Sequence, residues 1–211
     1  MKMVLLGVTG YTGQSLMEQA LAHEHNVIAI ARNPAKISLK HPNLQVFRGD
    51  VVSASSLTEA FSKSEVVISC VGVSNPTQAR KGTSVYSVGT RNIVEAMRKT
   101  NLLRLIVVSS AGVAPRKGAP LLYKLIVKPF FLEPAYRDMR VMEHFLSETE
   151  LDWTIVRPPY LTATPLRTDY RLMPDHNFDD DRPLSRFSLA HFLVTEAESP
   201  RFIKHVVAIS G

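Results

Sequence analysis

Three glycines near the start of the chain are spaced as in a turn that holds an anionic group. Gly7, Gly10 and Gly13 fall at every third position, between a short apolar run and a stretch with helical periodicity. Glycine allows a tight turn and a close approach of backbone to phosphate, and the first N–H groups of the following helix attract negative charge. Thr9 and Thr12 add hydroxyl donors. The stretch predicts the pyrophosphate site of a dinucleotide, with a ligand-free structural turn as the alternative.

Two cations come directly after the second apolar run, residues 26–31. Arg32 follows this run, and Lys36 lies one helical turn later, behind Asn33 and Pro34, which are typical of a helix cap and a first helical residue. A dinucleotide on the glycine turn brings its ribose to this strand end. An acidic residue here would bind a free 2′-hydroxyl, whereas an arginine accommodates a 2′-phosphate. The pattern favours NADP(H) over NAD(H), with two solvated cations as the alternative.

Two later strand ends complete the expected nucleotide site. Asp50 follows the third apolar run and is able to accept from the adenine amino group, with Val51 against the ring; a turn-forming Asp is the alternative. Val71 and Gly72 end the fourth run, where a small backbone leaves room for the ribose and the pyrophosphate. Cys70 beside them is interpreted as buried packing rather than as a reactive thiol.

The elements that must position these residues alternate along the chain. Near-continuous Val, Ile and Leu is typical of strands buried on both faces of a parallel sheet. Such runs span residues 2–7, 26–31, 44–49, 65–72, 103–110, 152–158 and 204–210. Stretches with helical periodicity span roughly residues 12–23, 54–63, 83–100, 135–149 and 188–198. The alternation predicts a doubly wound (Rossmann) α/β fold with a mostly parallel sheet and helices on both faces.

Two segments break this regularity. Residues 111–134 are rich in Pro, Lys and large apolar groups, and residues 159–185 are typical of a loop or a small hairpin. Both follow strand carboxyl ends, where ligands bind in such sheets. We therefore expect one NAD(P)-binding domain over residues 1–211, in which these two segments form the substrate side and a small C-terminal lobe.

Composition restricts the partners and the location. The 211 residues are 45% hydrophobic and 21% charged, and no apolar stretch reaches the ~18 residues of a membrane span. The net charge of +6 favours anionic ligands. The sequence has no Lys/Arg tract with interleaved aromatics that would indicate binding of nucleic acid.

The single cysteine excludes an internal disulfide and fits a reducing, cytoplasmic location. We expect a monomer or a small homo-oligomer. No metal is expected, because His23 and His25 are interpreted as a solvated helix terminus.

The chain resembles the atypical short-chain dehydrogenase/reductases in the stretches GVTGYTG, ARNPAK, GDV, GTRNIVEAM, VVSSAG and LDWTIVRPPYLT. Within them it is similar to the NAD(P)H-binding group that contains NADPH-dependent flavin reductase (biliverdin-IXβ reductase) and NmrA-like proteins. The resemblance spans Met3 to about Ile209. It implies that the pyrophosphate is lined by Gly7, Thr9, Gly10, Tyr11, Thr12 and Gly13.

The same resemblance implies a nicotinamide site. Ser109 and Ser110 would lie beside the nicotinamide ring, and Pro158 would close the nicotinamide site. The adenine and ribose contacts of Asp50, Val51, Val71 and Gly72, and the 2′-phosphate contacts of Arg32 and Lys36, agree with those inferred from the strand ends. The chain departs from the group near its end, where LSRFSLA has Ser188 in place of an Asp.

The catalytic candidates are Ser109 and Tyr136. Typical short-chain dehydrogenases use Tyr-x-x-x-Lys, in which the tyrosine donates a proton and the lysine relays protons; here Tyr136 is followed by Arg140. A guanidinium stabilises a tyrosinate electrostatically but does not lose its proton in proteins. An ordinary helical tyrosine is the alternative. Reduction of a carbonyl needs a proton donor at the oxygen, whereas reduction of a flavin needs mainly hydride delivery.

Three functions remain open from the sequence. The first is an NADPH-dependent reductase of a flat small-molecule acceptor such as a flavin, a quinone or a tetrapyrrole. The acceptor would stack on an apolar, aromatic surface, the acceptor shelf, formed by the segment LLYKLIVKPFF and Tyr160. Core packing is the alternative role of these residues. The second is an NmrA-like sensor that binds NADP(H), regulates a protein partner and turns over no acceptor. The third is an extended-type enzyme that modifies carbonyls or nucleotide sugars.

Overall fold

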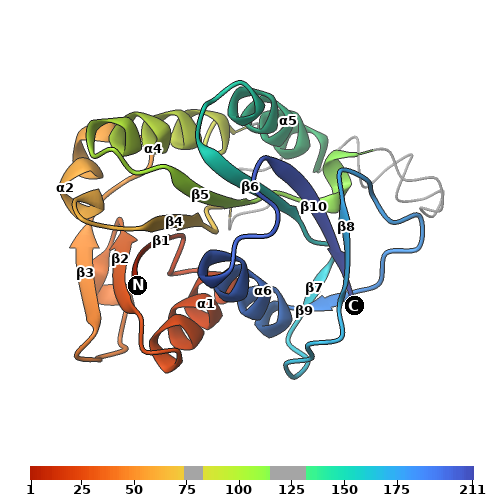
Figure 1. Ribbon diagram of the computed structural model, residues 1–211, viewed down its shortest axis with the longest axis horizontal. Helices are drawn as coiled ribbons and strands as arrows, with labels where there is room; N and C mark the ends of the chain where they lie inside the picture. The colour runs from red at the N-terminus through yellow and green to blue at the C-terminus, as the bar shows by residue number, and fades with distance from the viewer. Residues whose placement is uncertain (74–82, 115–131) are drawn as a thin grey trace.

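The short Val, Ile and Leu runs pair side by side as the strands of one sheet, in the order β3-β2-β1-β4-β5-β6-β10-β8 (Figure 1). The computed structural model describes residues 1–73, 83–114 and 132–211. Every pair in the sheet is parallel except β10 with β8. The strands are β1 (Lys2–Leu6), β2 (Asn26–Ala31), β3 (Leu44–Arg48), β4 (Val66–Ser69), β5 (Arg104–Val108), β6 (Asp152–Arg157), β8 (Arg171–Pro174) and β10 (His205–Ser210).

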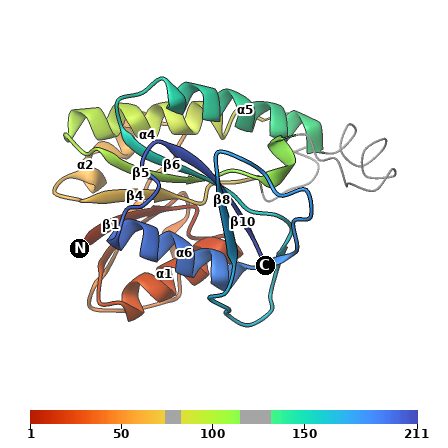
Figure 2. The same ribbon diagram turned by 45° about the vertical axis from the view of Figure 1, so that its right-hand side comes forward.

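Helices cover both faces of this sheet, as Figures 1 and 2 show. One face carries α1 (Tyr11–Ala22) and α6 (Arg186–Glu198); the other carries α2 (Thr58–Phe61), α4 (Ser87–Lys99) and α5 (Glu133–Ser147). Each face has its own apolar cluster, centred for example on Leu16 and Phe192 below the sheet and on Ile93 and Met97 above it. The predicted doubly wound Rossmann fold with helices on both faces is confirmed.

The helix expected over residues 54–63 is broken in the structure. A 3-10 turn (Ala54–Ser56) precedes the short α2. The hydroxyl of Ser56 donates to the carbonyls of Ser53 at 2.7 Å and Asp50 at 3.1 Å. A serine hydroxyl that bonds to local carbonyls competes with helical backbone pairing, which explains the break.

A buried ion pair fastens α6 to the sheet. Arg104, at the start of β5, donates from Nη2 to Glu196 Oε1 at 2.8 Å and from Nη1 to the Thr154 hydroxyl at 2.8 Å. Glu196 is fully buried and also accepts the N–H of Phe202 at 3.0 Å. Because its oxygens are satisfied by several donors, this carboxylate is tolerated in the interior.

The segment 159–185 is not a hairpin. Its short strands β7 (Leu161–Thr162) and β9 (Leu184–Ser185) pair in parallel, and β8 between them joins the main sheet antiparallel to β10. The edge pairing buries part of Leu172 against the apolar cluster on the α1 side of the sheet. A four-residue edge strand carries too little periodicity to be read from sequence. The structure describes no helix that is long and apolar enough to cross a membrane.

Candidate cofactor site

The predicted site residues gather at one edge of the sheet. Because the strands β1 to β6 are parallel, their carboxyl ends share that edge, and the strand order reverses there between β1 and β4. Such a reversal opens the crevice in which doubly wound folds bind ligands. The residues within three positions after these strand ends include Gly7, Arg32, Asp50, Val71, Gly72, Ser109, Ser110 and Pro158.

Two of the three glycines are required by the fold itself. Gly7 has φ +79°, and a Cβ there would lie 2.4 Å from the Cys70 carbonyl oxygen. A Cβ on Gly13 would lie 2.3 Å from the Gly7 carbonyl oxygen. Both distances are far below contact, so β4 and the first turn of α1 come as close to this loop as glycine permits.

Gly10 is different, because nothing in the described chain requires a glycine there. Its φ of −85° suits any residue, and a Cβ would meet only the Gly7 carbonyl oxygen, at an ordinary 3.4 Å. Gly10 is exposed and caps α1 without a side-chain hydrogen bond, and the first turn of α1 has no acidic residue. The exposed backbone and the free N–H groups of the helix start fit a phosphate that approaches from outside.

The other residues of the glycine turn leave the backbone around Gly10 exposed, and a positively charged side chain lies beside them. Thr9 and Tyr11 are exposed, and Thr12 is half-buried. The Arg186 guanidinium, at the start of α6, lies 4.9 Å from the centre of the Tyr11 ring. Sequence reasoning did not single out Arg186, although it lies in the quoted LSRFSLA stretch.

The two cations after β2 are exposed and unpaired within the described chain. Asn33 caps a 3-10 turn (Pro34–Lys36) by accepting the Ala35 N–H at 3.2 Å, so the predicted cap is confirmed in a shorter helix. Lys36 is the last residue of this turn, four positions after Arg32. Neither cation forms an ion pair with a described residue. Both charges are therefore free to meet an anionic ligand.

Two of the four residues predicted to contact adenine and ribose line one small recess. Val51 and Val71 line it together with Tyr86 and Gly89 of α4 and its approach. Val51 is buried, and a Cβ on Gly89 would lie 3.1 Å from its Cγ2. Gly72 at the rim is exposed. The structure thus brings together two of the predicted contacts.

Asp50 does not line this recess; its Oδ1 accepts the Val52 N–H at 3.2 Å, so Asp50 has the turn-forming role that is its alternative interpretation. Tyr86 does line the recess. The Tyr86 hydroxyl accepts the Val73 N–H at 3.3 Å. Burial raises the pKa of Tyr86, and the nearby Asp138 adds to this, although the Val73 hydrogen bond opposes it. Tyr86 therefore stays protonated and neutral.

Ser109 belongs to a buried polar network at the ends of β5 and β6. Its hydroxyl donates to Glu143 Oε1 at 2.6 Å. Glu143 in turn accepts from Arg157, at 3.1 Å from Nε and 2.5 Å from Nη2. Beside them, the Ala111 N–H donates to the Pro158 carbonyl at 2.9 Å, which holds the loops of the predicted nicotinamide site together.

Sequence reasoning missed Glu143 and Arg157. A signal for Glu143 was present, because it lies two helical turns after Tyr136 on one stripe of α5. Arg157 directly precedes Pro158 in a quoted motif. Neither signal says which partner the side chain meets, because Ser109, Glu143 and Arg157 come from three different elements.

Tyr136 and Arg140 both lie in α5, and the described contacts of Arg140 are not those of a proton relay. The Tyr136 ring packs over Gly112, where a Cβ would lie 2.2 Å from its Cζ. The Arg140 guanidinium forms an ion pair with Glu133 and donates to the Val113 carbonyl at 3.3 Å. Arg140 is thus occupied by groups other than a reacting hydroxyl.

The expected acceptor shelf is only partly described. The segment 121–131 lies outside the described residues, as does most of the segment 111–134. Tyr160 is described and highly exposed, with its carbonyl accepting the Leu184 N–H at 3.0 Å. Ser188, which replaces the Asp of the group pattern, accepts the Arg167 N–H at 2.9 Å and fixes the segment after β7.

This strand–turn–helix geometry agrees with the relatives of the chain. Residues 7–200 match the model of a family described as NAD(P)H-binding. The chain belongs to the NAD(P)H-binding family. It is 30% identical over 184 residues to an uncharacterized chloroplastic protein of Arabidopsis thaliana, an alignment that covers 78% of this chain and 60% of that relative. The chain therefore spans less than two thirds of that relative's length.

Solved structures share the fold over the whole chain. A wide-type short-chain dehydrogenase/reductase from Veillonella parvula, solved in complex with NADP, matches with a TM-score of 0.79 and 22% identity over 100% of this chain and 94% of its own. ChuY, an anaerobilin reductase from Escherichia coli, matches with a TM-score of 0.78 and 21% identity over 100% and 97%. At these identities the likeness concerns the fold.

Proposed function

We propose that this NAD(P)H-binding protein is an NADPH-dependent reductase that passes hydride to a flat acceptor such as a flavin, a quinone or a tetrapyrrole. The observation that carries the proposal is the state of Arg140, which stands where a lysine would relay protons to Tyr136 and is paired with Glu133 instead. A guanidinium cannot relay a proton. A flat acceptor whose protons come from water does not need that relay.

The binding half of the proposal rests on the glycine turn and on the end of β2. The open space over Gly10 would take the pyrophosphate, and the N–H groups at the start of α1 would donate to it. The guanidinium of Arg32 and the ammonium of Lys36 would meet the 2′-phosphate, which is why we propose NADPH rather than NADH. The cofactor supplies the hydride when it is bound.

The chemistry left to the chain is positioning. The Ser109 hydroxyl donates to Glu143, and Glu143 is held by Arg157, so the floor of the proposed nicotinamide site has a fixed shape. A fixed floor favours the face-to-face stacking of two ring systems, which is the main requirement for hydride transfer between them. Residues 159–185 would form the described part of the acceptor side.

The family relations support a reductase without naming its acceptor. One structural neighbour is an anaerobilin reductase, which is a reason to include tetrapyrroles among the test acceptors. Another was solved with NADP, which is a reason to test this cofactor first. The NmrA-like sensor remains the main alternative, because it needs the same cofactor site and no acceptor.

The test is NADPH oxidation, followed by absorbance, with a panel of flavins, quinones, tetrapyrroles and aldehydes. The proposal predicts turnover with at least one flat acceptor and none with aldehydes. Turnover restricted to aldehydes would contradict it and favour a carbonyl enzyme. An inert panel in the presence of measured NADPH binding would contradict turnover and favour the sensor. Retention of a protein partner that differs between NADP⁺ and NADPH would then identify the sensor.

A further inference from the structure

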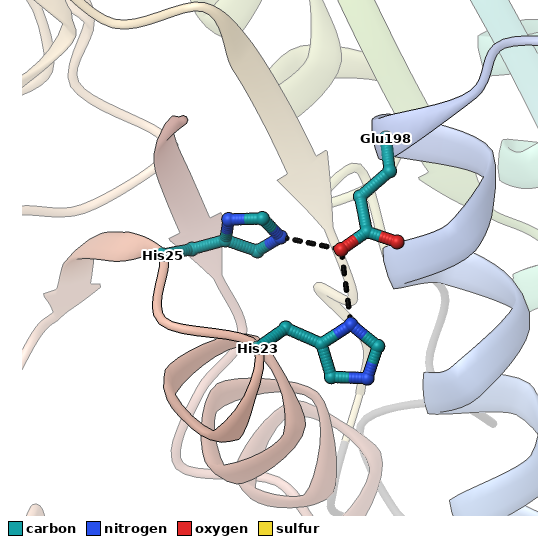
Figure 3. Close-up of side chains that lie close together, drawn as sticks. All are labelled: His23, His25 and Glu198. Atoms are coloured by element: carbon teal, nitrogen blue, oxygen red, sulfur yellow. Dashed lines mark hydrogen bonds and ion pairs between the residues drawn. The ribbon is translucent and has the colours of Figure 1, made fainter.

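Three side chains, those of His23, His25 and Glu198, meet where α1 ends, β2 begins and α6 ends (Figure 3). This is the amino-terminal edge of the parallel strands, opposite the edge that carries the candidate cofactor site. His23 Nδ1 lies 2.9 Å from Glu198 Oε1, and His25 Nε2 lies 2.8 Å from the same oxygen. The donor atoms of the three residues all lie within 4.8 Å of one another. His25 and Glu198 are 173 residues apart in the chain, so the fold builds this cluster.

The end of α1 turns the two imidazoles toward each other. The Glu24 N–H donates to the Leu21 carbonyl at 2.9 Å, and the His25 N–H donates to the Ala20 carbonyl at 3.0 Å, which is the pattern of a Schellman turn. Glu24 takes the left-handed position of that turn, with φ 60°, where glycine is usual. The turn buries His25, contrary to the solvated helix terminus expected from the sequence.

The surroundings favour a positive charge. His23 is the C-terminal cap of α1, and Glu198 is the last residue of α6, so two helices end at the cluster. The last turn of neither helix contains a basic residue. Helix C-termini carry partial negative charge and attract cations. A cation at the cluster would therefore meet two helix ends as well as the Glu198 carboxylate.

The donor set matches a zinc-class ion. Two imidazole nitrogens and one carboxylate oxygen are typical zinc ligands, at about 2.0–2.2 Å, which places tetrahedral donors about 3.3 Å apart. The two separations that involve Glu198 Oε1, 2.8 and 2.9 Å, are slightly shorter, so this oxygen must move about half an ångström away from each imidazole nitrogen. The two imidazole nitrogens lie within 4.8 Å of each other, which a rotation of the exposed His23 ring is able to adjust. His23 and Glu198 have side chains exposed by 40% and 30%, which leaves them room for this shift. Buried His25 would anchor the site.

We propose that His23, His25 and Glu198 form a binding site for a Zn²⁺-class divalent ion, with water completing the coordination. The ion would join the end of α1, the start of β2 and the end of α6. Glu198 Oε2 has no hydrogen-bond partner among the described residues and is free to bind the ion or its water.

The experiment is calorimetric titration of the full, chelator-treated chain with ZnCl₂, and with CoCl₂ under visible absorption. We expect one ion per chain and cobalt absorption bands typical of a site with protein nitrogen ligands. His23→Gln and Glu198→Gln should each weaken binding at least about a hundredfold, because ligand loss exceeds the effect of losing an outer contact. His144→Gln, which removes an exposed histidine beside Glu148, is the matched control and should bind like the wild type.

Absence of stoichiometric binding in the wild type would overturn the proposal and leave a hydrogen-bonded trio. Equal binding by His23→Gln and the wild type would overturn it as well. Thermal unfolding in chelator checks that the variants fold, and His23 is the safest position because it is exposed. Zinc at about 100 times its Kd should raise the wild-type Tm by roughly 5–10 °C. It should not raise the Tm of Glu198→Gln.

Discussion

The hydroxyl of Ser109 points at the Glu143 carboxylate, with 2.6 Å between Oγ and Oε1, and is buried with it. A donor used in this way is not available to the oxygen of a substrate. Ser109 was a catalytic candidate on sequence grounds, and the geometry favours a positioning role for it. The described network continues through Arg157 to the Asn177 side chain, 3.3 Å from Nη1.

Glu143→Gln should destabilise the fold by about 3 kcal/mol, because it leaves the largely buried Arg157 without a counter-charge. The side chains of this pair are exposed by only 9% and 17%. Urea unfolding measures the change. Glu95→Gln is the matched control, since the exposed pair of Glu95 with Lys99 contributes no more than about 0.5 kcal/mol. Equal effects of the two variants would contradict the network's role.

Tyr136→Phe should keep kcat within a few-fold of the wild type, since the ring packs over Gly112 and the hydroxyl is not the proton source in the proposed reaction. NADPH oxidation with the best acceptor of the panel measures this. A fall of two or more orders of magnitude with cofactor binding intact would restore the Tyr136–Arg140 pair as catalytic groups.

Gly10→Ala should reduce mainly the affinity for the cofactor, whereas Gly13→Ala should reduce mainly the stability of the fold. At position 10 the new methyl meets only the Gly7 carbonyl at 3.4 Å, so stability should change by no more than about 1 kcal/mol while NADPH and NADH affinity both fall at least about tenfold. At position 13 the methyl would lie 2.3 Å from backbone oxygen, so the loss of stability should be about 3 kcal/mol or more. Urea unfolding and cofactor titration separate the two. Unchanged affinity in a folded Gly10→Ala would contradict the pyrophosphate assignment.

Cys70 should behave as a packing residue. Burial raises the pKa of its thiol to about 12, although the residue as a whole is only partly buried. At pH 8 about one thiol in ten thousand is then ionised, so iodoacetamide should label the native protein at least about a hundredfold more slowly than the urea-unfolded chain. Labelling should accelerate with pH in the native protein well beyond pH 9. Equal native and unfolded rates would contradict a buried thiol.

The main sheet and the cofactor edge could be predicted from local sequence, because strands buried on both faces read as unbroken apolar runs. Once the runs ending at Leu6, Ala31 and Ser69 are taken as parallel strands, the positions after them must share one edge. The cap at Asn33 also follows from residue type, because Asn followed by Pro is typical of a helix start.

What could not be predicted depends on contacts between distant elements. Glu143 meets Ser109 and Arg157 only after α5 packs on the sheet, and Glu198 reaches His25 only after α6 packs on α1. The edge strand β8 is too short to carry a period, and its pairing with β10 decides its conformation. The sequence shows the chemical type of a polar side chain, but the packing of distant elements determines which partner it contacts.

The central claim is that the end of β2 binds the 2′-phosphate of NADPH, and paired dissociation constants test it most directly. NADPH and NADH are titrated at fixed salt against the wild type, Arg32→Ala, Arg32→Ala with Lys36→Ala, and Arg186→Gln. A charge-assisted hydrogen bond contributes roughly 1.5–3 kcal/mol, so Arg32→Ala should weaken NADPH binding about ten- to a hundredfold and leave NADH almost unchanged. The double variant should nearly lose the preference.

Arg186→Gln is the matched control for charge, because this guanidinium lies beside Tyr11 at the pyrophosphate turn and should affect both cofactors alike. The predicted result is therefore a selective loss of NADPH affinity in Arg32→Ala against a parallel loss in Arg186→Gln. The account is contradicted if the wild type binds NADH as tightly as NADPH, or if Arg32→Ala weakens both cofactors equally.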